Sequence, residues 1–138
     1  MSLIGKLHPL LVHFPIALVL AAAGAEIVAI RTRHERWHAI AVANLRAGAV
    51  TAALTLIAGW VLATAPFIEA TASLTLHRWA GVAAAGATVG ASLASRLDGQ
   101  SRRSLAVYRG ALFGAAVLVA ITGHLGAALV WGSDFLRP

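Results

Sequence analysis

Cysteine is absent from the sequence, and charged residues are scarce. None of the 138 residues is cysteine, which excludes disulfide bonds, thiolate metal sites, iron–sulfur ligation and covalent attachment of a c-type haem. Only 12% of the residues are charged, about half of the share of roughly 25% that is typical of soluble domains. The missing thiols remove whole classes of redox site, and the shortage of charge argues against a soluble globule.

Apolar residues dominate instead, at 59% of the chain. A helix that crosses a membrane needs about 20 mainly apolar residues, and the sequence contains four runs of about this length. It therefore predicts an all-α protein, a four-transmembrane-helix bundle that forms one domain over residues 1–138. The expected spans cover about residues 7–30, 39–65, 74–94 and 110–131.

The basic residues have a pattern that predicts topology. A net charge of +6 suits nucleic acid as a partner, but most of the arginines lie between the expected first and second spans or between the third and fourth. The middle connection, residues 66–75, has none. Basic loops stay on the cytoplasmic side, so we expect no nucleic-acid partner. We expect a multi-pass protein of the bacterial cytoplasmic (inner) membrane, with both termini on the outer side.

Few ionisable residues lie within the spans. Glu26 in the first span and Arg46 in the second are placed to neutralise each other, and we interpret them as a structural pair. His34 and His38 fall in or beside a basic loop, where solvated side chains are expected. Because ionisable groups inside a membrane are costly, those that remain are candidates for function.

Four histidines gather in the expected outer half of the bundle: His8, His13, His77 and His124. By helical rise, His13 and His124 lie at similar depths, and His8 and His77 lie closer to the outer interface. Imidazoles that face each other across a helix bundle are the ligands that a b-type haem requires. The sequence therefore predicts haem b bound in the outer half.

A single haem between His13 and His124 is the first expectation, because His8 and His13 point about 140° apart around one helix. His77 is then the substitute ligand and His8 occupies a shallow site, while a second haem that uses His8 and His77 stays open. Small residues beside the histidines leave room for a flat ring, and a nearby arginine can pair with propionates. These cofactor-binding candidates are Gly81, Gly123 and Arg78.

Glycine pairs in the inner halves of the third and fourth spans match the G-x-x-x-G motif of closely packed membrane helices. They are Gly86 with Gly90 and Gly110 with Gly114. We expect these two helices to pack tightly there and to diverge above, which would leave a cavity around the histidines.

Two other functions remain open. The same four histidines suit copper or zinc, since imidazole binds both, although no thiolate, methionine cluster or carboxylate accompanies them. Alternatively, the chain is a non-catalytic structural subunit of a membrane redox complex, in which the histidines only join helices. No hydrolytic or nucleophilic arrangement is present, so independent catalysis is not expected.

Three segments carry a resemblance to a known family. They are residues 7–18 (LHPLLVHFPIAL), residues 77–81 (HRWAG) and residues 123–126 (GHLG). These segments resemble a bacterial four-helix membrane family, the domain of unknown function numbered 2231. Its members occur alone or joined to Rieske-type or cytochrome c-type domains, which implies an electron-transfer role at the outer face. For this chain, the resemblance implies a separate redox protein or a quinone as partner. Whether the chain forms a homo-oligomer or is a subunit of a larger complex stays open.

Overall fold

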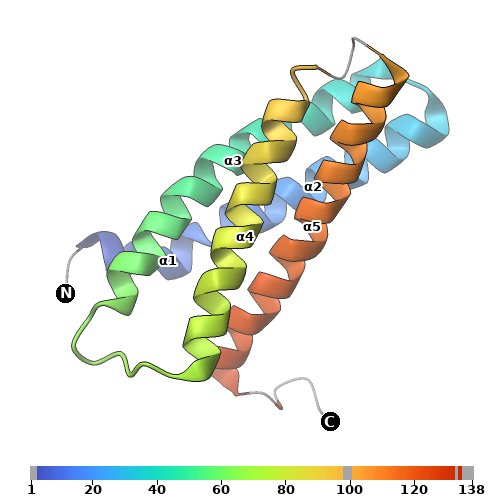
Figure 1. Cartoon of the computed structure of the whole chain (residues 1–138). Coiled ribbons are helices and arrows are strands. Elements are labelled where there is room, and N and C mark those ends of the chain that lie inside the picture. The colour runs from blue at the N-terminus through green and yellow to red at the C-terminus, as the bar shows by residue number, and fades with distance from the viewer. Residues whose placement is uncertain (1–2, 98–100, 133, 135–138) are drawn as a thin grey trace.

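A computed structural model describes residues 3–97, 101–132 and 134, and all regular structure in this part of the chain is helical (Figure 1). The expected all-α class is therefore confirmed. The helices are α1 (Leu3–Leu11), α2 (His13–Thr32), α3 (Glu35–Ala63), α4 (Ala72–Ala94) and α5 (Arg102–Trp131).

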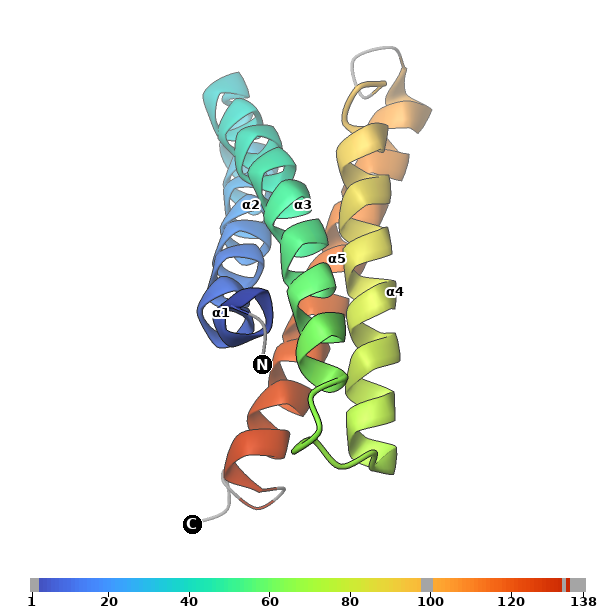
Figure 2. The same ribbon diagram turned by 90° about the vertical axis from the view of Figure 1, so that its left-hand side faces the viewer.

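The first apolar run is divided into two helices at Val12. Pro15 has no N–H, so the carbonyl of Leu11 lacks its helical donor. The hydroxyl of Thr55 in α3 donates to that carbonyl at 3.2 Å instead. Figure 2 shows α1 nearly end-on beside the lower part of α2, so the chain turns sharply between them. The bend carries α1 across the bundle to α3.

The fourth apolar run begins earlier than expected, at Arg102 rather than near residue 110. Ser101 and Ser104 form a capping box, in which each side chain bonds the backbone N–H of the other residue. This satisfies N-terminal donors that would otherwise lack partners. The cap therefore allows α5 to begin about two turns before the expected span, within residues 102–109, which are too polar to be part of a predicted span.

Three segments are long and apolar enough to cross a membrane: Gly5–Thr32, Glu35–Ala63 and Arg102–Trp131. The helix α4 is long enough, with 23 residues, but it is not apolar enough to be counted with these three segments. Serine, threonine, His77 and Arg78 dilute its apolar character, and alanine and glycine fill much of the rest. The prediction of four spans is thus confirmed for three, and residues 74–94 form a helix that is not shown to be a span.

The bundle consists of two helix pairs. The most extensive contacts join α4 to α5 and α2 to α3, and both pairs run along the bundle in Figure 1. Alanine supplies most of the buried core, together with a few larger side chains such as Leu45, Tyr108 and Leu112. Small side chains allow the helix backbones to approach closely, as is usual in membranes.

The expected role of the G-x-x-x-G motifs was wrong. Gly86, Gly90, Gly110 and Gly114 are all exposed, and a Cβ built on any of them meets nothing within 4 Å. The α4–α5 contact uses alanines such as Ala84 and Ala115 instead. Gly48 does allow close packing of α3 on α2, since a Cβ there would lie 3.0 Å from Val19 of α2.

The two basic connections lie together. Figure 1 shows the α2–α3 and α4–α5 connections at one end of the bundle, and the α3–α4 connection at the other. The C-terminal end of α5 is also at the latter end. The separation of basic and non-basic ends that the sequence predicts is therefore present in the fold.

Candidate functional site

A cavity of about 790 Å³ opens between α1, α3, α4 and α5, with the start of α2 at its edge. Its walls are mainly apolar, and they include Ile16, Leu56, Trp60, Phe67, Leu74 and Trp131. Cofactor and ligand sites in proteins commonly have volumes of roughly 300–1,000 Å³, with apolar walls and a few polar groups. The cavity has this character. Its polar lining consists of histidines, threonines, Arg78 and Glu69, so a carboxylate accompanies the histidines although none was expected from the sequence.

His8 reaches this cavity from α1 and packs against α3. A Cβ at Gly59 would lie only 2.7 Å from Cε1 of the His8 ring, so the ring fits because residue 59 has no side chain. His8 Nδ1 lies 3.1 Å from the carbonyl oxygen of Thr55. A carbonyl can only accept, so Nδ1 donates and Nε2 keeps its lone pair. A histidine ligand typically has this arrangement, with the other ring nitrogen bonded to a carbonyl.

His77 lines the same cavity from α4 and packs against α5. A Cβ at Gly126 would lie 3.0 Å from Cε1 of the His77 ring. Nδ1 of His77 is buried, and no hydrogen-bond partner for it is found among the described residues. The His77 ring also lies near the backbone of Thr122 in α5. His8 and His77 therefore line one cavity from different helices. The His8 ring packs against Gly59 of α3, and the His77 ring packs against Gly126 of α5.

Arg78 forms the polar corner of the cavity. Its guanidinium carbon lies 3.9 Å from the centroid of the Trp60 ring, and Trp60 in turn meets Trp79 edge-on at 6.2 Å. This is a cation–π contact, which holds the guanidinium over the ring. Arg78 Nε is buried without a hydrogen-bond partner in the described part of the chain. An arginine held in this way is prepared to pair with an anionic group of a ligand.

The other predicted site residues are placed differently. Gly81, Gly123 and His13 all line the cavity, although His13 is exposed at its edge. His124 is exposed and does not belong to the lining. Because an α-helix has 3.6 residues per turn, His124 points away from the face on which Gly123 and Gly126 lie. The cavity lining thus contains His8, His13 and His77 but not His124, and the pairing of His13 with His124 stays a prediction.

A second polar cluster lies on α2, roughly 15 Å along the helix from the cavity-lining Ile16. Glu26 is completely buried. Its Oε1 accepts from Nε of Arg109 at 2.8 Å, and its Oε2 lies 2.8 Å from Nδ1 of His38 and accepts from the Tyr108 hydroxyl at 3.3 Å. The cluster joins the α2–α3 pair to α5.

Two interpretations made from the sequence are corrected by this cluster. Arg46 is exposed on α3 and is not the partner of Glu26, a place taken by Arg109. His38 is not a solvated loop residue, because it lies half-buried between Glu26 and the edge of the Tyr108 ring. His34 is exposed, as expected.

A site for copper or zinc gains no support from the geometry. Within the described residues, no three histidine or carboxylate side chains gather closely enough to hold a metal ion. The predicted set of His8, His13, His77 and His124 is therefore not assembled as one ligand group. Two imidazoles are too few to hold a bare metal ion, but they suit a cofactor whose own ring supplies most of the ligands to its metal.

Sequence reasoning missed Thr55, Gly59 and Trp60 as parts of the site. Pro15 was the available signal for Thr55, because a proline inside a membrane helix leaves a carbonyl that another helix must satisfy. Gly59 gave a weaker signal as an isolated glycine in an apolar run. The contact of Trp60 with Arg78 depends on how α3 and α4 pair, which no local pattern reveals.

The fold and the cavity define a multi-pass helical membrane protein, with three segments able to span and a largely apolar site between helices. The chain belongs to the DUF2231 family of predicted membrane proteins, which it matches over residues 6–135. The resemblance of the three sequence segments is thus confirmed as membership. No curated protein and no solved structure matches the chain.

Proposed function

We propose that the protein is a membrane cytochrome that holds one b-type haem in the cavity, with His8 and His77 as the axial ligands. The observation that carries the proposal is that His8 of α1 and His77 of α4 line one largely apolar cavity, where each ring packs against a glycine of another helix. A b-type haem needs two axial nitrogens and no covalent bond to the chain. Because both imidazoles share one cavity, we propose one haem rather than two.

The state of each imidazole supports this ligand pair. Donation from His8 Nδ1 to the Thr55 carbonyl leaves the Nε2 lone pair available. His77 has a buried ring nitrogen without a partner among the described residues, which is costly unless a ligand or water satisfies it. His13, at the edge of the cavity, is a nearby substitute, whereas His124 is on another face of α5.

Arg78 supplies the complementary charge. Its buried, unpartnered Nε and its stacking on Trp60 suit a carboxylate such as a haem propionate. Gly81 and Gly123 line the same space without side-chain bulk. The residues present support the proposal in three respects: nitrogen ligands, a largely apolar space and a cation for the acidic substituents, with Glu69 as the one acidic residue among the described lining.

A bound haem supplies one-electron exchange at its iron. The chain's own residues hold the ligand nitrogens and, through Arg78, neutralise negative charge. We propose that the protein lies in the bacterial inner membrane with both termini outside, because its basic connections lie at the end opposite the C-terminal end of α5. Electrons then pass between quinol or an extracytoplasmic redox protein, of Rieske or cytochrome c type, and a further partner.

The test is the visible spectrum of the protein purified from cells supplied with haem precursors. We expect a sharp α-band in the reduced-minus-oxidised difference and about one haem per chain. A folded, monodisperse protein without haem would overturn the proposal and favour the structural-subunit interpretation.

A further inference from the structure

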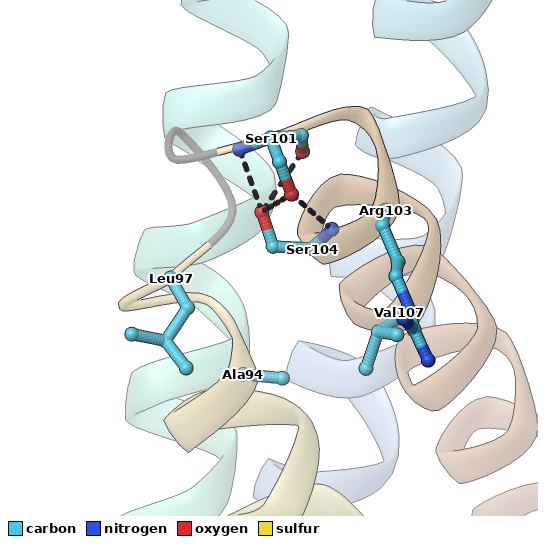
Figure 3. Close-up of a pocket in the computed structure, with 6 residues that line it drawn as sticks. All are labelled: Ala94, Leu97, Ser101, Arg103, Ser104 and Val107. Atoms are coloured by element: carbon cyan, nitrogen blue, oxygen red, sulfur yellow. Dashed lines mark hydrogen bonds between the residues drawn. The ribbon is translucent and has the colours of Figure 1, made fainter.

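A second, smaller hollow lies at the basic end of the bundle, far from the cavity. It is a groove of about 260 Å³ between the end of α4 and the first turns of α5. Figure 3 shows Ala94 and Leu97 on the α4 side and Arg103 beside Val107 on the α5 side. Leu97 and Val107 are 52% and 57% exposed. The groove therefore combines open apolar walls with one guanidinium.

The surroundings of the groove are strongly positive. Six arginines are exposed on the two connections at this end: Arg31, Arg33, Arg36, Arg96, Arg102 and Arg103. Among the described residues of these connections, Glu35 is the acidic side chain that offsets them. Such clusters beside membrane spans attract anionic lipid headgroups. The charge of this end thus complements the negative surface of a leaflet.

We propose that this groove binds an anionic phospholipid, with its phosphate on Arg103 and the beginning of an acyl chain along Leu97 and Val107. Ser101 and Ser104 bond each other in the capping box of α5. Arg103 is the charged side chain among the described lining residues. The apolar walls decide the source of the phosphate. A soluble phosphate gains nothing from Leu97 and Val107, whereas a lipid buries acyl surface against them.

Native mass spectrometry of the intact chain tests this proposal. The protein is released from nanodiscs of equal parts phosphatidylglycerol and phosphatidylcholine, and the lipids it retains are counted. We expect preferential retention of phosphatidylglycerol. Arg103→Gln should lower that retention about fivefold, the change that corresponds to one cation near an anionic headgroup. Val107→Ser keeps the charge but removes an apolar wall, and it should also lower retention.

Arg31→Gln is the matched control, because it removes the same charge from the other connection at the same end. It should lower the retained phosphatidylglycerol clearly less than Arg103→Gln does, because Arg31 does not line the groove. Equal losses in Arg31→Gln and Arg103→Gln, or equal retention of the two lipids, would overturn the proposal and show a general surface charge. Complete displacement of lipid by millimolar glycerol phosphate would also overturn it, because the groove would then bind a soluble anion.

Discussion

The His8 imidazole occupies the space that a side chain at residue 59 would need, since a Cβ on Gly59 would lie 2.7 Å from His8 Cε1. The position of the proposed ligand His8 therefore depends on the absence of a side chain at Gly59 of α3. This close fit also holds His8 where its Nδ1 meets the Thr55 carbonyl.

Gly59→Ala should therefore displace His8 without removing it. We expect haem retention to fall at least about tenfold, the usual minimum when the support of a metal ligand is disturbed, while the alanine is favourable to the helix itself. Haem content per chain, measured after purification, checks this. Gly86→Ala is the matched control, because its Cβ meets nothing within 4 Å. Equal haem content in the two variants would contradict the assignment of His8.

The sequence predicted that His8, His13 and His77 lie toward one end of the bundle, and all three line one cavity, but it did not predict the direction of each side chain. The direction of His8 depends on the break at Val12, which separates its helix from that of His13, and His124 points outward from α5. Side-chain direction follows from helix rotation and crossing, and both are set by packing between residues far apart in the chain.

The partner of Glu26 illustrates the same limit. The sequence correctly indicated that a buried carboxylate needs a cation, and it offered Arg46 on the next helix. The structure uses Arg109, which lies 83 residues away. The approach of α5 to α2 could not be read from local patterns, whereas helix existence and the positions of the basic connections could.

Thr55→Val should destabilise the fold while leaving the haem ligand in place. Valine has nearly the same shape but cannot donate to the Leu11 carbonyl, which Pro15 leaves without its helical partner. We expect a loss of about 1 kcal/mol in the free energy of unfolding, measured by denaturant titration in mixed micelles. The backbone carbonyl that accepts from His8 is retained, so haem content should remain unchanged. Loss of haem at unchanged stability would show that the hydroxyl acts on the cofactor instead.

Glu26→Gln should weaken the link between the two helix pairs. The amide cannot neutralise Arg109, and the half-exposed positions of Arg109 and His38 limit the penalty to about 1–3 kcal/mol. Arg46→Gln, at an exposed position, should change stability by less than about 0.5 kcal/mol. Thermal unfolding of both variants in one detergent makes the comparison. Similar stabilities would mean that the buried cluster contributes nothing to the fold.

The central claim, that His8 and His77 hold one haem, is tested most directly by the reduced-minus-oxidised spectra of four single variants measured in parallel. These are His8→Ala, His77→Ala, His13→Ala and His124→Ala. The account predicts that the α-band is lost or strongly reduced in His8→Ala and His77→Ala and is retained in His124→Ala, with His13→Ala close to the unaltered protein. Loss of the α-band in His13→Ala and His124→Ala, with full retention in the other two, would contradict it.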